Sequence, residues 1–367
     1  MLRKRYGPDP YRWGNYTLLR MSPAAYFVDN RSFWLPGFRL QDLGAASMSE
    51  TLRSTAQALL EFPRQSQRIA ETYLLFAGRS KTTTIAGIDG ESYTPVFQAF
   101  LSSNISMSYT FLDVGPADGE GHQSPLFDFM KAHRDRIRGV ALEGNETFCT
   151  KYRMNWPEVD LQCGHLTAGR LYDHAPFFLK SLRSVCSPHG EGGGAHCVDV
   201  WKVDIDSIDC TVLEVLLRRS ELDLRPKAVI LEVNPHFPPP YKFSVLGVQG
   251  PESDGDFWAR NMMGLYGCSL SHQVDILRDF GYWLIGFDHK DALFVHKNFA
   301  HAFNATAPLD EYVAYSAALI TIGSGLTPRT LRRWYSARPH VGLGLIQQHL
   351  VAAQQHLAQE VTFSLSI

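Results

Sequence analysis

Acidic residues and a glycine-rich turn stand at positions in the sequence where chemistry could take place. Asp113 lies near the end of the apolar run Met107–Val114, and glycines follow it at positions 115, 119 and 121. Glycine in a tight turn lets backbone N–H groups approach a ligand closely, because no Cβ intervenes. An apolar strand, a glycine turn and a helix over 124–132 are typical of the entrance to a nucleotide-type site in an open α/β sheet. The pattern also fits an ordinary strand-to-helix turn, so other parts of the sequence are needed to distinguish a ligand site from a simple turn.

Further polar residues follow other short apolar runs. They are Glu143, Asp204, Glu232 and Asn234, at the ends of runs over 137–142, 198–203 and 228–233. Right-handed crossovers place the carboxyl ends of parallel strands at one edge, which is where open α/β sheets bind ligands. Because buried unpaired charge is costly, acids gathered at that edge are hard to explain by packing alone.

The elements that position these residues alternate between strand and helix. Apolar runs predict strands over 107–114, 137–142, 159–163, 198–203 and 228–233, with helices over 124–132, 146–153 and 209–219 between them. Strands separated by helices predict a parallel, doubly wound sheet. Two further runs, over 282–287 and 292–295, predict a terminal antiparallel hairpin.

The flanking segments carry different patterns. Residues 1–45 predict an irregular arm, and helices are expected over about 50–62 and 66–77. Residues 242–268 predict a long connection that could act as a lid. The tail after about residue 300 is expected to be helical, with an apolar face from Ile346 to Val361 that core packing or a homodimer contact would explain. We therefore divide the chain into an accessory region (1–104), a sheet domain (105–298) and a helical extension (299–367).

Composition limits the classes of partner. A net charge of −2, without a block of Lys and Arg, argues against nucleic acid, and no apolar run approaches the length of a membrane span. The amino-terminal residues lack the apolar segment of a secretory signal, so the cytoplasm is the expected location. Five Asn-x-Ser/Thr triplets favour the secretory lumen as the alternative; they begin at Asn15, Asn30, Asn104, Asn145 and Asn304.

The six cysteines lie between residues 149 and 268 and include no C-x-x-C pair. Reduced, buried cysteines are therefore the expectation. Cys186 and Cys197 flank a Gly-rich loop that a disulfide could close, or that could hold a metal with nearby histidines. The spacing is not that of a familiar zinc site, so both remain minor alternatives.

The arrangement of the glycines and acids discriminates between cofactors. A second acid one strand beyond the glycine turn is typical of ribose recognition, and Glu143 occupies that position. The glycines are spaced G-x-x-x-G-x-G instead of G-x-G-x-x-G, which disfavours a dinucleotide. The sequence also lacks the Gly-Lys-Ser/Thr motif of a phosphate-binding loop.

Over about residues 105–297 the chain resembles the FkbM-type S-adenosylmethionine-dependent methyltransferases. Residues 113–119 read D-V-G-P-A-D-G and are similar to the family's D-x-G-A-N-x-G. Residues 139–145 resemble the second-strand motif, residues 201–209 resemble K-I-D-V-E-G-x-E, and residues 229–234 resemble the fifth strand. The chain departs from the pattern at Pro116, Ala117, Asp206 and Ser207, where the family has Ala, Asn, Glu and Gly.

The resemblance implies S-adenosylmethionine as cofactor and a Rossmann-like α/β fold. That fold has a mostly parallel seven-stranded sheet with a C-terminal antiparallel hairpin, and here it would carry helical N- and C-terminal extensions. The implied cofactor-binding residues are Asp113, Gly115, Ala117 and Gly119 for the amino-carboxypropyl end, Glu143 for the ribose, and Gly164 and His165 for the adenine. Asp204, Asp206 and His236 are the candidates for a base in the in-line methylation of a hydroxyl on a carbohydrate or other small molecule.

Three alternatives stay open. A metal-assisted O-methyltransferase would use Asp204, Asp206 and Asn234 as oxygen ligands for Mg²⁺ or Ca²⁺. An N-methyltransferase is suggested by the segment 234–237, N-P-H-F, which is similar to the N-P-P-Y/F element of amino-methylating enzymes but follows the fifth strand instead of the fourth. The third alternative is a non-catalytic binding protein that keeps the fold.

Overall fold

A computed structural model describes part of the chain. It covers three short segments between 12 and 29, followed by 94–120, 126–166, 176–186 without 179 and 185, 196–218, 225–249, 264–288, 290–311, 314–315, 339–355, 357 and 360–367. The helices expected over 50–62 and 66–77 and the Gly-rich loop 187–194 lie outside these residues. No helix of the described segments is long and apolar enough to cross a membrane.

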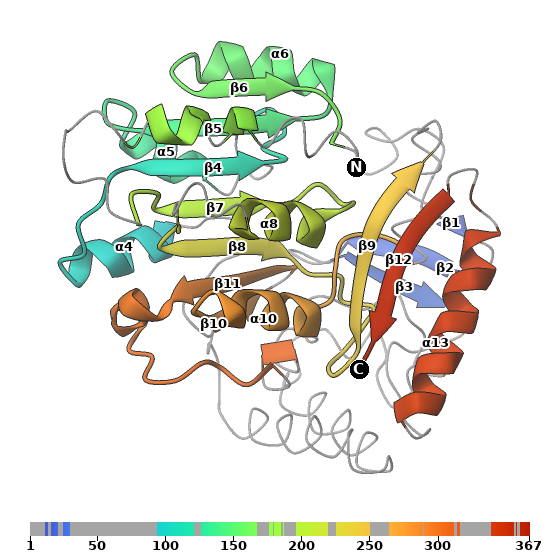
Figure 1. Cartoon of the computed structure of the whole chain (residues 1–367). Helices are drawn as coiled ribbons and strands as arrows, with labels where there is room; N and C mark the ends of the chain where they lie inside the picture. Colours follow the sequence, from blue (N-terminus) through green and yellow to red (C-terminus); the bar gives the residue numbers. More distant parts are fainter. Residues whose placement is uncertain are drawn as a thin grey trace.

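A mostly parallel sheet of seven strands forms the centre of the described structure, in the order β10-β11-β8-β7-β4-β5-β6 (Figure 1). Its strands are β4 (Thr110–Val114), β5 (Arg138–Glu143), β6 (Asp160–Cys163), β7 (Val200–Val203), β8 (Ala228–Glu232), β10 (Tyr282–Asp288) and β11 (Asp291–His296). Strand β11 runs antiparallel to both β8 and β10, and the remaining pairs are parallel. The predicted parallel sheet and its terminal antiparallel hairpin are confirmed.

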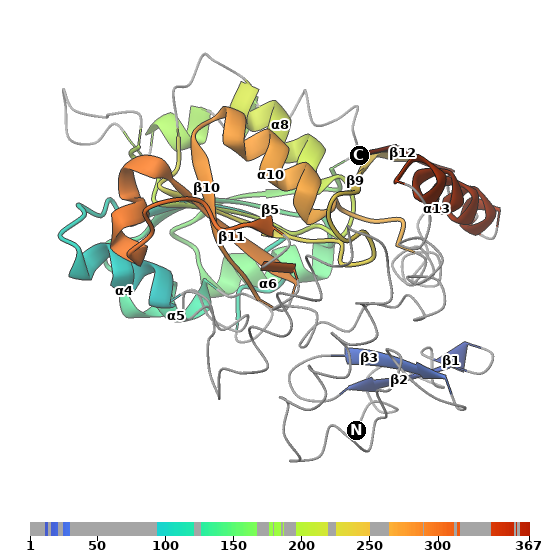
Figure 2. The ribbon, with the colours of Figure 1, turned by 90° about the horizontal axis from the view of Figure 1, so that it is seen from below.

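Helices cover both faces of this sheet (Figure 2). One face carries α4 (Thr94–Ser102), α5 (Phe127–Ala132) and α6 (Glu146–Asn155), and the other carries α8 (Asp209–Arg218) and α10 (Leu270–Asp279). Because side chains alternate along a strand, Phe111 joins the core under α4 and α5 while Leu112 joins the core under α8. Burial on both faces explains why these strands read as continuous apolar runs.

The same alternation places the charged residues near the strand ends on one face of the sheet. Each of these residues comes two positions after an apolar residue that packs in the core under α4, α5 and α6, so it points to the same face. They are Asp113, Glu143, Lys202 and Glu232. Register brings Asp113 opposite Lys202 on the neighbouring strand β7. Strand order and side-chain parity therefore gather these charges at one edge and on one side.

A second, two-stranded sheet stands beyond the carboxyl ends of the parallel strands (Figure 1). Strand β9 (Lys242–Gln249) pairs antiparallel with β12 (Glu360–Ser366), next to helix α13 (Pro339–Gln354). The expected 242–268 connection therefore begins with a strand, and the expected helix through Val361 ends seven residues earlier, at Gln354. Residues 360–366 alternate polar and apolar side chains, which is a strand period that pairs here with a distant segment.

Residues 12–29 contain short strands where an irregular arm was expected. They are β1 (Arg12–Trp13), β2 (Tyr16–Arg20) and β3 (Ala25–Asp29), joined antiparallel. Aromatic and β-branched residues favour extended backbone in these segments.

The expectation of reduced cysteines is wrong. All six cysteines are described and pair as Cys149–Cys163, Cys186–Cys197 and Cys210–Cys268. Their Cα atoms lie 6.0, 5.7 and 6.0 Å apart, within the range that a disulfide spans. The Cys186–Cys197 disulfide, a minor alternative from the sequence, is confirmed. The other two pairs depend on which strand and helix ends the fold brings together, so no local pattern predicts them. With both sulfurs bonded, a metal on Cys186 and Cys197 is also ruled out.

Candidate functional site

The turn after β4 packs so closely on β7 that its first position requires glycine. Gly115 has a φ of +84°, and a Cβ there would lie 1.8 Å from the carbonyl oxygen of Asp204. Gly119 has a φ of +71°, and a Cβ there would lie 2.7 Å from the Tyr152 ring. The two glycines therefore let the turn fit between β7 and α6.

Hydrogen bonds from α6 and its C-terminal end hold the far side of this turn. Trp156, which follows α6, donates from Nε1 to the carbonyl of Gly119 (2.8 Å), and Asn155 donates to the carbonyl of Asp118 (3.0 Å). Ala117 has a φ of +53°, in the left-handed region that asparagine enters more readily than alanine. This preference offers a physical reason for the asparagine of the similar family motif.

Glu143 connects the glycine turn to the end of β5. Its Oε2 accepts a hydrogen bond from the backbone N–H of Ala117 (2.9 Å), and its Oε1 accepts one from Asn145 (2.7 Å). Burial raises the pKa of Glu143, against the two backbone hydrogen bonds, which lower it. A carboxylate offers about four lone-pair positions, so it can accept further hydrogen bonds from a ligand.

Asp113 lies beneath the turn and not on its surface. It is 0% exposed, and its Oδ1 lies 3.6 Å from Nζ of Lys202, without a hydrogen bond to either carboxylate oxygen. Burial raises the pKa of Asp113 to about 6, although Lys202 opposes the shift. Lys202 also lies 3.3 Å from Asp204 and donates to the carbonyl of Gly115 (3.0 Å). Asp113 therefore acts on the turn through Lys202.

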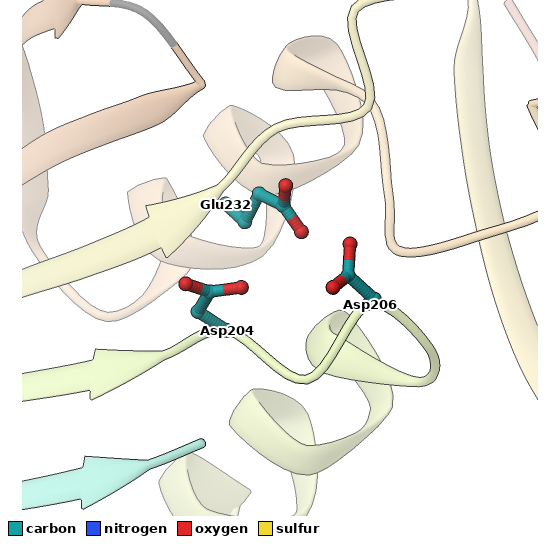
Figure 3. Close-up of side chains that lie close together, drawn as sticks. All are labelled: Asp204, Asp206 and Glu232. Carbon is teal, nitrogen blue, oxygen red and sulfur yellow. The ribbon is translucent and has the colours of Figure 1, made fainter. Parts of the chain in front are cut away.

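Three carboxylates converge at the ends of β7 and β8 (Figure 3). Oxygen atoms of Asp204, Asp206 and Glu232 all lie within 4.8 Å of one another. Lys290 contacts Oε1 of Glu232 at 2.9 Å, while Oε2 of Glu232 is buried without a hydrogen-bond partner. Burial is the main cause that raises the pKa of Glu232, followed by the negative charge of Asp206.

Asp209 shapes the loop that carries Asp204 and Asp206. Its two oxygens accept hydrogen bonds from the backbone N–H groups of Ile205 (2.8 Å) and Ser207 (3.0 Å). Burial raises the pKa of Asp209 to about 7. The neighbouring Cys210–Cys268 disulfide joins the first turn of α8 to the segment before α10. Asp209 thus has a structural role, as the start of a helix suggests.

Asn234 is not part of the acidic cluster. Its Nδ2 donates to the carbonyls of Gly264 (2.8 Å) and Tyr266 (2.7 Å), and its Oδ1 accepts from the backbone of His236 (3.0 Å). The side chain is used to hold the loop 264–266. The oxygen donors that the fold brings together are therefore Asp204, Asp206 and Glu232, in place of the expected set with Asn234.

His236 is buried beside this loop. A Cβ on Gly264 would lie 3.1 Å from its ring, and burial lowers the pKa of His236 to about 3. A neutral imidazole with so low a pKa is a weak proton acceptor near neutral pH.

The ends of β5 and β6 border the same edge. Gly164 has a φ of +139°, donates to the carbonyl of Glu143 (2.9 Å) and has open space where a Cβ would stand. The exposed His165 packs against Gly144, where a Cβ would lie 2.9 Å from its Nδ1. The Cys149–Cys163 disulfide fixes this edge to α6.

Two lysines that take part in the site were not among the sequence candidates. Lys202 could have been found, because it lies within the apolar strand β7, on the same side of the sheet as Asp113 in β4. Lys290 lies in the hairpin turn between β10 and β11, and no local pattern marks its approach to Glu232. Glu232 itself was seen as a strand-end acid but was not assigned to the site.

Neither protein-family models nor curated protein sequences give a match to the chain. Among solved structures it is similar to an amino pentose methyltransferase, CalS10 from Micromonospora echinaspora, at 10% identity, with 58% of this chain and 94% of that chain covered and a TM-score of 0.29. It is similar to an O-methyltransferase from Bacillus cereus at 18% identity, with 51% and 76% covered and a TM-score of 0.24. A SAM-dependent methyltransferase from Aquifex aeolicus gives 13% identity, 62% and 98% coverage and a TM-score of 0.28.

Proposed function

We propose that the protein is an S-adenosylmethionine-dependent methyltransferase of the FkbM type, which methylates a hydroxyl of a carbohydrate or other small molecule. The observation that carries the proposal is the junction of Glu143 with the glycine turn. One buried carboxylate holds the backbone of that turn at 2.9 Å and still has lone pairs for a ribose, one strand from the turn.

The residues along the edge fit the parts of this cofactor. The backbone of residues 115–119 would hold the amino-carboxypropyl group, Glu143 the ribose hydroxyls, and Gly164 and His165 the adenine. No described atom lies within 4 Å of the position that a Cβ on Gly164 would take, so the described structure does not block a planar ring there. When bound, the cofactor supplies an electrophilic methyl group on a positively charged sulfur. The carboxylates of Asp204, Asp206 and Glu232 give the edge the complementary negative charge.

The chain's own contribution to the reaction is alignment and proton removal. In-line transfer depends on holding the acceptor oxygen opposite the methyl group. Asp204 and Asp206 are partly exposed at the edge and are the proposed proton acceptors. His236 was a further candidate, but its low pKa and burial favour a role in holding the 264–266 loop.

A cation-assisted reaction is the second candidate, favoured by the buried Oε2 of Glu232, which has no hydrogen-bond partner. Oxygen atoms of Asp204, Asp206 and Glu232 lie within 4.8 Å of one another, and carboxylate oxygens are the ligands that Mg²⁺ and Ca²⁺ prefer. Bound there, the cation would lower the pKa of an acceptor hydroxyl.

Calorimetry with S-adenosylhomocysteine tests the cofactor. We expect wild-type protein to bind it. Glu143→Gln should weaken binding at least about tenfold, because replacing one carboxylate oxygen by an amide removes a charged hydrogen bond worth about 1.5–3 kcal/mol. The matched control is Glu146→Gln, at an exposed position in the first turn of α6. No binding to wild-type protein at millimolar ligand would reject the proposal, and equal affinity in Glu143→Gln would reject the ribose assignment.

A glycine pair tests the turn itself. Gly115→Ala should abolish binding, because its Cβ would meet the carbonyl of Asp204 at 1.8 Å. Gly344→Ala in α13, where nothing lies within 4 Å of a Cβ, should leave binding unchanged. Circular dichroism on each variant separates loss of the site from loss of the fold. A folded Gly115→Ala protein with wild-type affinity would contradict the turn assignment.

A chelator series separates the two candidate reactions. Activity lost in EDTA and restored by Mg²⁺, but not restored in Glu232→Gln, would establish the cation-assisted reaction. Turnover that is unaffected by EDTA would remove it and leave alignment and a carboxylate base as the mechanism.

A further inference from the structure

Three disulfides and an unusual set of asparagines point to an environment that the site does not explain. All six cysteines are paired, and disulfides of this kind persist in oxidising compartments but are rare in the cytosol. Five of the nine asparagines in the sequence begin an Asn-x-Ser/Thr triplet, the acceptor pattern for N-linked glycans. The two observations are independent, since one concerns sulfur chemistry and the other the residues two positions after asparagine.

Two of these asparagines lie on tight turns that expose their side chains. Asn104 follows α4 with a φ of +56°, and Asn304 ends the 3-10 helix η5 (Lys297–Phe303) with a φ of +54°. Both residues are exposed. An exposed turn can carry a bulky, soluble glycan without disturbing the core.

The two turns lie together at the amino edge of the sheet. Asn104 precedes β4, and η5 directly follows β11. Because β11 runs antiparallel to β8, the end of β11 lies beside the start of β8. Phe100 of α4 and Phe303 of η5 pack with ring centroids 5.6 Å apart. Glycans at both positions would lie at the end of the sheet where the parallel strands begin, and Figure 1 shows α4 there, opposite the carboxyl ends of β5 and β7.

Asn145 forms a contrast within the same chain. Its side chain accepts hydrogen bonds from the backbone N–H groups of Thr147 (2.9 Å) and Phe148 (3.3 Å), and its own N–H donates to Glu143. It caps α6 at the carboxyl edge, among the residues of the site. The cap uses the side-chain oxygen, so what sets Asn145 apart is its position: a glycan there would lie among the residues of the site, whereas glycans on Asn104 and Asn304 would lie at the amino edge.

We propose that the protein works in an oxidising secretory compartment and carries N-linked glycans at Asn104 and Asn304, while Asn145 stays unmodified. The glycans would cover the amino edge of the sheet and leave the carboxyl edge open to small molecules. The inference does not depend on the reaction catalysed there.

The test uses the full chain directed into the secretory pathway of a eukaryotic cell. Release of glycans by peptide-N-glycosidase in H₂¹⁸O, followed by peptide mass spectrometry, should mark Asn104 and Asn304 by ¹⁸O-labelled deamidation and leave Asn145 unlabelled. Thiol titration of the denatured, unreduced protein should detect no free thiols. If Asn104 and Asn304 are unlabelled, the proposed glycan sites are wrong, and if Asn145 is labelled, the proposal that it stays unmodified is wrong. Six free thiols in a folded protein would contradict the assignment to an oxidising compartment.

Matched variants at the third position of each triplet keep the asparagines in place. Thr306→Ala and Ser106→Ala should each remove one glycan and raise gel mobility by one step. Thr306→Ser and Ser106→Thr retain the acceptor pattern and should migrate like wild type. Mobility that does not respond to Thr306→Ala or to Ser106→Ala would reject a glycan at the corresponding asparagine.

Discussion

The charged residues at the sheet edge are held by other charges, by backbone groups, or by both. Lys202 bridges Asp113 and Asp204 and also holds the carbonyl of Gly115, and Glu143 holds the N–H groups of Ala117 and Asn145. Removing one partner of a buried pair leaves the other charge uncompensated, which costs about 3–5 kcal/mol. These side chains therefore fix the shape of the turn as well as the charge of the site, and their substitution should be judged by folding and binding together.

His236 predicts a pH dependence of stability. Burial lowers its pKa from the ordinary value of 6.5 to about 3 in the folded protein, so below pH 6.5 only the unfolded chain gains this proton. The contribution of His236 to the free energy of unfolding is fully present above pH 6.5 and declines as the pH falls towards 3. Between pH 7 and pH 5 the loss is about 2 kcal/mol. In His236→Gln, the fall in the free energy of unfolding over this interval should be smaller by about that amount, as measured by urea denaturation.

The control for this measurement is His301→Gln, which replaces an exposed histidine of η5 and should preserve the wild-type pH slope. If His236→Gln folds poorly, His236→Phe offers a second variant without a titrating group. A slope identical to that of wild type in a folded His236 variant would contradict the lowered pKa.

At the scale of elements, the sequence predicts a strand or helix that depends on neighbouring residues, but it does not predict pairings between distant segments. Local apolar runs predicted β4, β5, β7 and β8, and alternation along them would also have placed Lys202 beside Asp113. The pairing of β9 with β12 joins segments more than one hundred residues apart, so neither strand carries its partner in its own pattern. For the same reason the sequence did not predict the Cys149–Cys163 and Cys210–Cys268 disulfides or the approach of Lys290 to Glu232, because each depends on the completed fold.

The disulfides differ in how much chain they constrain, and this predicts unequal contributions to stability. Cys210 and Cys268 are 58 residues apart in the sequence, whereas Cys186 and Cys197 are 11 apart. By loop-closure entropy, replacing the first pair with alanines should lower the free energy of unfolding by roughly 4 kcal/mol and replacing the second by roughly 3 kcal/mol. Guanidinium denaturation of both double variants measures the difference. A larger loss from the 186–197 pair would show that native contacts dominate over chain entropy.

At the scale of the whole molecule, the C-terminal extension shares the core of the sheet. Ile346 and Leu350 of α13 and Val361 of β12 belong to the same buried cluster as Leu112 and Trp201 of the central strands. The apolar face that suggested either core packing or a homodimer contact is thus buried within the chain at these positions. A cluster that continues from the sheet into the extension favours one cooperative unit over a domain with a separate appendage.

Two adjacent residues of α13 test this cooperativity. Leu350 is 0% exposed and Val351 is 50% exposed. Leu350→Ala should lower the free energy of unfolding by about 3 kcal/mol, because it leaves a cavity in the shared core. Val351→Ala should change it by less than about 0.5 kcal/mol. Calorimetry should show a single transition that moves to lower temperature in Leu350→Ala, because the extension and the sheet unfold together. A second, earlier transition in that variant, with the main one unmoved, would instead show that residues 339–367 unfold independently of the sheet.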